Sequence, residues 1–273
     1  MPLVDVCSIF EAVKEEFLMG IPTDAIPVGV LLGGQGAVGK GQLNLWAEKI
    51  YDTHQFLAIN GDNYRMWHPE FDALRKDIWT FSEKTQQFSN VFTEGLIKEA
   101  FQRRLSFVVE GTMRSPETPI KTATALRNHG YKSAAFAIAA PKEISLMNIF
   151  NRYFREVQNK GFGRMVDIAS HNAAVDGLPE SLDRLFHEKI VDRICVFDCF
   201  ARTMVADYHL ADGGWNSKVL PSAVVLQTRE RQLSETQLTD AILESAKRTI
   251  QGLTDERVKT FATEAYRQLT ESV

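Results

Sequence analysis

A glycine-rich stretch from Gly34 to Gly41 contains the residue types that bind a chain of phosphates. It fits the pattern G-x-x-x-x-G-K, follows an apolar run at Val28–Gly33 and precedes a helical pattern at Gln42–Tyr51. We predict that backbone N–H groups here point at a nucleotide's phosphates and that Lys40 reaches the β- and γ-phosphate oxygens. The predicted nucleotide-binding residues are Gly34, Gln35, Gly36, Ala37, Val38, Gly39, Lys40 and Gly41.

One position of this loop departs from the pattern. Residue 41 is Gly where the pattern has Ser or Thr, whose hydroxyl binds Mg²⁺. We therefore expect no direct metal ligand from the loop, and a metal held through water, with Asp62 or Glu110 as candidates. The alternative is a glycine-rich turn that binds no nucleotide. A guanine-recognition motif N-K-x-D is absent, because Asn159-Lys160 is followed by Gly161-Phe162, and this favours a small-molecule kinase over a GTPase.

Carboxylates follow two later apolar runs. A kinase that phosphorylates a hydroxyl needs a carboxylate to orient that hydroxyl or accept its proton. Asp62 follows the run Phe56–Ile59 and Glu110 follows Phe107–Val109, and the carboxyl ends of parallel strands lie beside the phosphate loop. We predict Asp62 as general base, and Glu110 as a contact for substrate hydroxyls or metal-bound water. A helix N-cap for Asp62 and a structural ion pair for Glu110 are the competing interpretations.

A basic segment, residues 152–164, supplies cations for the charge on a transferring phosphoryl group. Its charged residues are Arg152, Arg155, Glu156, Lys160 and Arg164. We predict that Arg152 and Arg164 bind the phosphate, and that Gly161 and Gly163 let the segment move as a lid. The alternative is a solvated basic surface.

Apolar runs and helical patterns alternate along the chain, which predicts an α/β fold with a central, mostly parallel sheet flanked by helices. The expected strands are Val28–Gly33, Phe56–Ile59, Phe107–Val109 and Ser133–Ala140, with weaker candidates at Ile194–Phe197 and Val224–Leu226. Phe81–Arg104 and Lys142–Glu156 are expected as helices, and a polar helical tail begins at Ser234, where Ser234 and Gln237 form a candidate capping box. We expect one domain over residues 1–273, with a core at about 25–200 and a helical extension at about 230–273.

Composition argues against several classes of protein, among them general nucleic-acid binders and membrane-spanning proteins. The 273 residues carry 31 Lys+Arg and 35 Asp+Glu, a formal charge of −4, which argues against a general nucleic-acid binder. The longest apolar stretch, Ala134–Pro141, is far shorter than the ~20 residues of a membrane helix, and the N-terminus does not resemble a secretory signal. The cysteines Cys7, Cys195 and Cys199 are too few for a disulfide framework. We expect a cytoplasmic protein with inert thiols and neither a nucleic-acid nor a membrane partner.

Four motifs in order resemble the zeta toxins of bacterial toxin–antitoxin systems. They are GGQGAVGKG at 33–41, NGDNYRMWHP at 60–69, VVEGTMR at 108–114 and RYFREV…GFGR at 152–164. Zeta toxins are P-loop kinases that phosphorylate UDP-N-acetylglucosamine and so starve cell-wall synthesis. The resemblance covers about residues 25–200 and implies a P-loop kinase fold with helical additions at both ends.

The resemblance also assigns roles by position. The matched residues are Lys40 as the loop lysine, Asp62 as the catalytic aspartate, Glu110 and Thr112 as sugar contacts, and Arg152 and Arg164 as phosphate ligands. We add Arg65 and Arg114 as candidates for binding the uridine diphosphate and sugar, with Tyr64 and Trp67 beside them. The family implies ATP and Mg²⁺ as cofactors, a UDP-amino sugar as acceptor, a small helical antitoxin covering the nucleotide site, and a bacterial cytoplasm.

Three departures from the family pattern leave alternatives open. Gly41 replaces Thr, Asn60 replaces the first Asp of DGD, and Ala37-Val38 replaces Gly-Ala, which stiffens the loop. The alternatives are a P-loop kinase acting on another small-molecule hydroxyl, such as an antibiotic or nucleoside, and a catalytically weakened protein that binds nucleotide or antitoxin.

Overall fold

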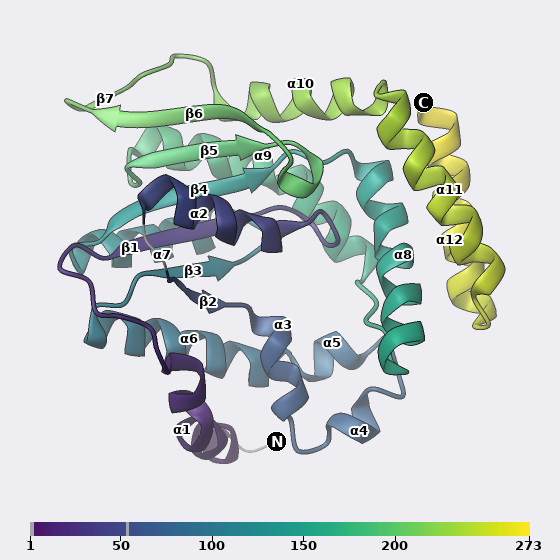
Figure 1. Ribbon diagram of the computed structural model, residues 1–273, viewed down its shortest axis with the longest axis horizontal. Coiled ribbons are helices and arrows are strands. Elements are labelled where there is room, and N and C mark those ends of the chain that lie inside the picture. Colours follow the sequence, from purple (N-terminus) through teal and green to yellow (C-terminus); the bar gives the residue numbers. More distant parts are fainter. Residues whose placement is uncertain (1–2, 53–54) are drawn as a thin grey trace.

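A computed structural model describes residues 3–52 and 55–273, and the strands in this part of the chain form one sheet (Figure 1). The strands are β1 Val28–Gly33, β2 Leu57–Ile59, β3 Phe107–Glu110, β4 Lys132–Ile138, β5 Arg193–Phe197, β6 Met204–Ala211 and β7 Gly214–Trp215. Their order is β2-β3-β1-β4-β5-β6-β7; the first five are parallel, and β6 and β7 are antiparallel additions. The predicted mostly parallel α/β sheet is confirmed.

Helices flank the sheet and extend the chain at both ends, as predicted. The longer ones are α1 Leu3–Leu18, α2 Leu43–Tyr51, α6 Gln86–Arg103, α7 Glu117–Asn128, α8 Lys142–Lys160, α9 Ile168–Glu188, α10 Pro221–Leu233, α11 Thr236–Gly252 and α12 Glu256–Ser272. Short turns of helix, α3 Gly61–Tyr64, α4 Phe71–Leu74 and α5 Phe81–Lys84, connect β2 to α6.

The two faces of the sheet bury different side chains, because successive residues of a strand point to opposite sides. Val30 and Leu32 of β1 belong to a core with α2, α8, α11 and α12. Leu31 belongs to a second core with α1, α6, α7 and α9. Since both faces are covered, β1 reads as a continuous apolar run, which is why it is recognisable in the sequence.

The strand order determines where a ligand can bind. β1 lies between β3 and β4: the connection that leaves β1 leads to β2 on one side of it, and the connection that leaves β3 leads to β4 on the other side. Open parallel sheets bind ligands at such a switch point. The ends of β1, β2 and β3 open toward α3 and α8, which stand at this edge of the sheet (Figure 1).

Three local predictions need correction. Val224–Leu226 lies inside α10, because Pro221 starts a helix there and a short apolar run fits either element. The pattern Phe81–Arg104 comprises two helices, α5 and α6, instead of one. Ser234 is no capping-box residue: α11 follows Glu235, and the Ser234 hydroxyl donates to the Arg231 carbonyl.

An aromatic cluster anchors the segment that carries the second motif. Phe92 of α6 is 0% exposed and stacks on Phe88 and Tyr64, with ring centroids 4.8 and 5.5 Å away. We expect Phe92→Ala to lower the free energy of unfolding by about 3–5 kcal/mol in urea denaturation, since truncation removes buried area and leaves a cavity. Leu45→Ala, at a position 61% exposed, is the control and should change stability by less than about 0.5 kcal/mol. Equal losses in the two variants would contradict this.

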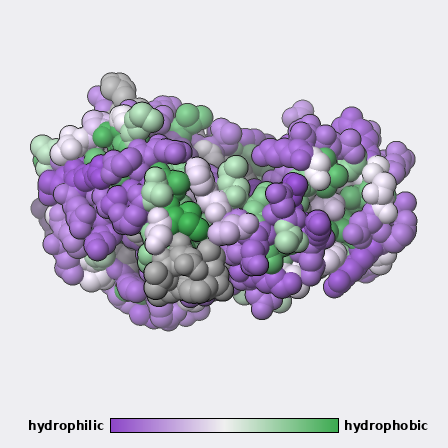
Figure 2. Space-filling model, turned by 90° about the horizontal axis from the view of Figure 1, so that it is seen from below, coloured by the Kyte–Doolittle hydropathy of each residue, from purple (hydrophilic) through white to green (hydrophobic). Residues whose placement is uncertain are grey.

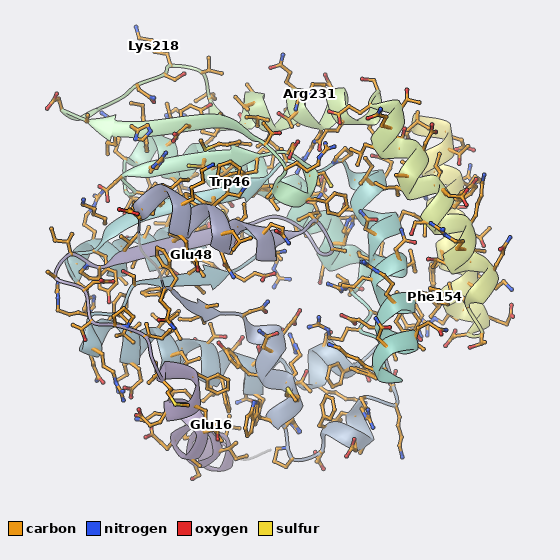
Figure 3. All side chains as sticks on the ribbon, in the orientation of Figure 1. Glu16, Trp46, Glu48, Phe154, Lys218 and Arg231 are labelled. Carbon is orange, nitrogen blue, oxygen red and sulfur yellow. The ribbon has the colours of Figure 1, made fainter. Side chains whose placement is uncertain are left out.

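The C-terminal helices pack on the outer side of α8. Phe154 points from α8 toward them (Figure 3), and a Cβ on Gly252 of α11 would lie 2.4 Å from the Phe154 ring. The Thr249 hydroxyl of α11 donates to Asn151 Oδ1 of α8 at 2.8 Å. The extension is thus joined to the helix that carries Arg152.

Hydrophilic residues cover most of the face in Figure 2, where hydrophobic patches are small and separate. Within the described residues, no helix is both long and apolar enough to cross a membrane.

Candidate active site

The glycine-rich loop has the backbone conformation of a phosphate cradle. Gly34 and Gly39 have φ values of 137° and 89°, which favour glycine. A Cβ on Gly39 would lie 2.8 Å from the Phe200 Cα, so no side chain fits there. Ala37 also has a positive φ of 60°, so the chain adopts at this position a conformation that is costly for alanine.

The Lys40 side chain lies inside this loop. It is 8% exposed, and its Nζ donates to the carbonyls of Gly34 and Gln35 at 2.8 Å each. Glu110 Oε1 lies 3.6 Å from Nζ. Burial lowers the pKa of Lys40, although the Glu110 carboxylate opposes that shift. The loop therefore places a compact cation where the phosphates of a bound nucleotide would lie.

The Gln35 side chain points away from this cradle. Its Nε2 donates to the Ala140 carbonyl at 2.8 Å and to the Ser145 hydroxyl at 3.1 Å, and the side chain is buried. Gln35 thus ties the loop to the start of α8, and the backbone is the part of this residue that can serve a nucleotide.

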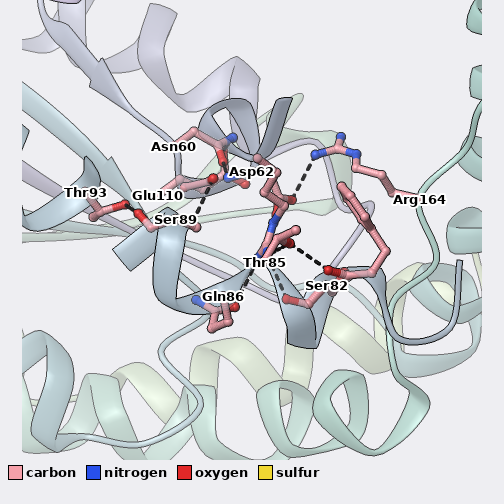
Figure 4. Close-up of polar contacts among 12 residues, drawn as sticks. Asn60, Asp62, Ser82, Thr85, Gln86, Ser89, Thr93, Glu110 and Arg164 are labelled. Carbon is pink, nitrogen blue, oxygen red and sulfur yellow. Dashed lines mark hydrogen bonds and ion pairs between the residues drawn. The ribbon is translucent and has the colours of Figure 1, made fainter. Parts of the chain in front are cut away.

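The start of α3 orients Asp62 (Figure 4). Asn60 caps this helix, because its Oδ1 accepts from the Asp62 N–H at 3.0 Å. The N-cap interpretation of Asp62 is therefore wrong, and its carboxylate, 43% exposed, is left for other partners. Arg164 Nη1 lies 3.1 Å from Asp62 Oδ2, and Arg65 Nε donates to Asp62 Oδ1 at 2.9 Å.

Asn60 also joins the two acidic candidates. Its Nδ2 donates to Glu110 Oε2 at 2.7 Å, so one amide links Glu110 to the backbone of Asp62. Glu110 also pairs with Lys40, as the competing interpretation of a structural ion pair predicted. At the same time its carboxylate faces the same space as Asp62. An aspartate at position 60 would place a third carboxylate beside those of Asp62 and Glu110, and it could not donate to Glu110 as the Asn60 amide does.

Glu156 holds Arg164 in place, a role that its count as an opposing charge in the basic segment did not predict. Glu156 Oε2 accepts from the Arg164 backbone N–H at 2.9 Å, and Glu156 Oε1 lies 3.1 Å from Arg164 Nη2. Burial lowers the pKa of the Arg164 guanidinium, but Asp62 and Glu156 outweigh it and the net shift is upward. The sequence feature that could have indicated this contact is the position of an acidic residue, Glu156, eight residues before Arg164.

Arg152 differs from Arg164 because hydrogen bonds within the described protein do not fully satisfy its buried guanidinium. Its Nε is buried and has no hydrogen-bond partner in the described chain. Burial and the neighbouring positive charge of Arg164 lower its pKa, while Glu156, Asp62 and Glu110 oppose the shift. Two guanidinium groups close enough to disfavour each other are typical of a site that binds an anion.

Asp62 remains ionised in this surrounding. Burial raises its pKa, but Arg164, Arg65 and Arg152 together lower it below the ordinary aspartate value. The carboxylate is therefore available as a proton acceptor or hydrogen-bond acceptor at neutral pH.

Arg65 donates hydrogen bonds to several protein groups. Besides Asp62, it donates to the Ser82 carbonyl, Thr85 Oγ1 and Gln86 Oε1 at 2.7–3.0 Å (Figure 4). This buried guanidinium positions Asp62, and the expected contact of Arg65 with substrate stays a prediction.

Thr112 and Arg114 follow β3 and are exposed. Among the described residues, no hydrogen bond or ion pair joins their side chains to Asp62, Glu110 or the arginines. The Thr112 carbonyl instead accepts from the Gly34 N–H at 3.3 Å, so this segment supports the phosphate loop. Their predicted roles in substrate binding stay predictions.

The rest of the basic segment differs from the predicted lid. Helix α8 continues to Lys160, and the side chains of Arg155 and Lys160 on it are exposed. Gly161 ends this helix at φ 68°, and a Cβ on Gly163 would lie 2.6 Å from the Tyr153 carbonyl. Gly161 thus supplies the left-handed conformation that ends α8, and Gly163 allows close packing against Tyr153. The role of the two glycines as hinges stays a prediction.

The residues fit a nucleotide better than they fit a metal ion. Within residues 3–52 and 55–273, no three His, Cys, Asp or Glu side chains gather to hold a metal ion. Asp62 and Glu110 are each already paired with a cation. A metal ion here would depend on phosphate oxygens and water for most of its ligands.

The family model of the zeta toxin matches residues 14–210. The chain belongs to the zeta toxin family. Toxin PezT of Streptococcus pneumoniae serotype 4 is 28% identical over 222 residues, covering 77% of this chain and 86% of that protein. Toxin zeta of Enterococcus hirae is 29% identical over 227 residues, covering 81% and 74%.

Solved structures agree with this zeta toxin fold. A chain from the PezAT chromosomal toxin–antitoxin system of Streptococcus pneumoniae superposes with a TM-score of 0.76 at 20% identity, covering 92% of this chain and 98% of that one. A chain from the AvrRxo1-ORF1:-ORF2 structure with ATP has a TM-score of 0.51 at 17% identity, covering 97% and 81%. The predicted P-loop kinase fold is confirmed, and at the family level the protein is a kinase-like phosphotransferase.

Proposed function

We propose that this protein is an ATP-dependent kinase that phosphorylates a hydroxyl of UDP-N-acetylglucosamine or a related UDP-amino sugar. The observation that carries the proposal is the convergence of Lys40, Arg152 and Arg164 on the space beside Asp62. Phosphoryl transfer needs cations around the moving group and a carboxylate at the acceptor hydroxyl, and little else from the protein.

Each residue has a defined part in this proposal. The loop N–H groups and Lys40 bind the β- and γ-phosphate oxygens, and Arg152 and Arg164 bind the transferring phosphoryl group. Asp62 accepts a hydrogen bond and then the proton of the acceptor hydroxyl, while Arg65 holds its carboxylate in place. Glu110 orients the sugar. Asp62 or Glu110 would hold Mg²⁺ through water, and the ion would neutralise phosphate charge.

We further propose that the protein is the toxin of a toxin–antitoxin pair in a bacterial cytoplasm. Phosphorylated UDP-N-acetylglucosamine would no longer serve cell-wall synthesis. The PezAT chain described above comes from a toxin–antitoxin system, which supports an antitoxin as partner. We propose that this antitoxin is small and helical and covers the nucleotide site, as the family resemblance implies. Such a partner would compete with ATP for the charged groups described above.

A panel of acceptors tests the substrate. The protein is incubated with ATP, Mg²⁺ and, separately, UDP-N-acetylglucosamine, UDP-N-acetylgalactosamine, UDP-glucose, an aminoglycoside and a nucleoside, and each acceptor is examined by mass spectrometry for an added phosphate. Phosphorylation of the UDP-amino sugars supports the proposal. Product from the aminoglycoside or nucleoside alone favours the other-acceptor kinase, and ATP binding without any product favours the catalytically weakened protein.

Gly41→Thr tests the metal argument. Gly41 is exposed, and a Cβ there would meet nothing within 4 Å, so a threonine fits without disturbing the loop. We expect the Mg²⁺ concentration for half-maximal activity to fall severalfold, because the hydroxyl adds an oxygen ligand that the native loop lacks.

Gly41→Val is the matched control, since valine has the shape of threonine without the hydroxyl. Its Mg²⁺ dependence should equal that of the parent protein. Identical metal profiles for the Thr and Val variants would show that the missing ligand does not limit the enzyme.

A further inference from the structure

The loop after β5 touches the phosphate loop directly. The Phe200 N–H donates to the Val38 carbonyl at 2.9 Å. The Phe200 Cα also occupies the space next to Gly39, where a Cβ would lie 2.8 Å away. A displacement of the segment 198–202 would therefore displace the phosphate loop.

The backbone of this segment adopts a conformation that its side chains do not favour. Phe200 and Ala201 have φ values of 65° and 52°, two consecutive positive values at residues other than glycine. Such a conformation persists only where the surrounding structure holds it. The shape of this loop thus depends on its contacts with neighbouring elements.

Besides an ion pair between Arg202 and Glu235, with Nη2 and Oε2 3.0 Å apart, three contacts to the middle of the segment hold it. Trp46, labelled on α2 in Figure 3, donates its Nε1–H to the Ala201 carbonyl at 2.9 Å. The Phe200–Val38 bond comes from the phosphate loop, as described above. The third contact comes from Gln232 of α10, which lies beyond the residues 14–210 that match the zeta toxin model.

Gln232 joins the ends of two strands. Its side chain is 0% exposed, its Oε1 accepts from the Cys199 N–H at 2.6 Å, and its Nε2 donates to the Ala139 carbonyl at 2.6 Å. Ala139 follows β4, and Cys199 starts the turn after β5. Since a buried N–H without a partner is costly, loss of Gln232 would favour a rearrangement of the Cys199 turn.

We infer that Gln232 is a positioning residue for the nucleotide side of the site. It fixes the Cys199 turn, which through Phe200 fixes the phosphate loop at Val38 and Gly39. The inference rests on the proposed function in one respect, that ATP is the ligand of this loop. It gives the C-terminal extension a part in ATP binding, while the acceptor side, built on α3 and β3, does not depend on Gln232.

Gln232→Met tests the inference, because methionine has a similar shape and makes none of the side-chain hydrogen bonds of Gln232, including that from Nε2 to the Thr228 carbonyl at 3.1 Å. The dissociation constant of ATP is measured by calorimetry, and the KM values of ATP and UDP-N-acetylglucosamine by kinetics. We expect ATP binding to weaken about tenfold while the acceptor KM stays within about twofold of the parent value. A residue that serves stability alone would lower the folded fraction without separating the two affinities.

Two further variants keep the outcome decisive. Gln232→Glu retains an oxygen for the Cys199 N–H and should weaken ATP binding less than Gln232→Met; it decides the question if the methionine variant does not fold. Thr239→Val, the control, removes a buried hydroxyl of α11 that bonds to the Glu235 carbonyl, and should leave ATP binding unchanged.

The results separate this inference from the proposed function. If the parent protein does not bind ATP, both are overturned. If it binds ATP and the Gln232 variants bind equally well, or if ATP and acceptor affinities fall together, the positioning role alone is overturned.

Discussion

Asp62→Asn is expected to lower kcat by about 10²–10⁴-fold, the contribution that a positioned general base typically makes. Asparagine keeps the shape of the side chain but has no basic carboxylate for the acceptor proton. The amide oxygen can still accept from Arg65 Nε, as the carboxylate does at 2.9 Å, whereas the contact of Arg164 with the second oxygen at 3.1 Å is lost. Steady-state kinetics with ATP and UDP-N-acetylglucosamine measure the effect.

The control for this prediction is Asp72→Asn. Asp72 pairs with Arg75 on the surface of α4, with 84% of its side chain exposed, and this variant should keep the activity of the parent. Turnover of Asp62→Asn within about threefold of the parent would show that Asp62 is not the base.

Lys40→Met is expected to lower kcat by about 10²–10³-fold, the loss typical when one preorganised donor to a developing charge is removed. Methionine fills the space of the buried lysine stem, so the loop should keep its shape. The effect should be larger on kcat than on ATP affinity, because the loop N–H groups still bind phosphate. Single-turnover kinetics and calorimetry with ATP separate the two.

Lys49→Met provides the comparison on the same part of the chain. Lys49 is an exposed residue of α2 whose Nζ lies 4.9 Å from the centre of the Trp46 ring, away from the phosphate loop. Its replacement should leave both constants unchanged. A Lys40→Met enzyme as fast as Lys49→Met would remove Lys40 from the mechanism.

Much of the fold could be predicted because its strongest signals are local. β1 is buried on both faces and reads as an unbroken apolar run, and the glycine-rich loop follows it directly. The strand β6 escaped prediction because it is an antiparallel addition with polar residues such as Asp207 and His209. The helix at Val224–Leu226 was missed because three apolar residues fit a strand or a helix equally well.

Some residues of the candidate site could also be predicted from the sequence, and others could not. Lys40, Asp62 and Glu110 follow strands, so the parallel sheet itself brings them to one edge. The functions of Asn60, Arg65 and Glu156 as supports depend on which hydrogen bonds their side chains make, and residue type and spacing do not determine these. Gln232 lies more than thirty residues from the turn that it holds, so the sequence offers no signal for it.

Transfer of label from γ-³²P-ATP tests the central claim most directly. The protein is incubated with labelled ATP, Mg²⁺ and UDP-N-acetylglucosamine, and the products of the parent and of Asp62→Asn are separated by chromatography. The account predicts label on the sugar nucleotide with the parent protein and a rate lower by about 10²–10⁴-fold with Asp62→Asn. Label that stays on ATP, or appears only as inorganic phosphate at equal rates in both proteins, would contradict it.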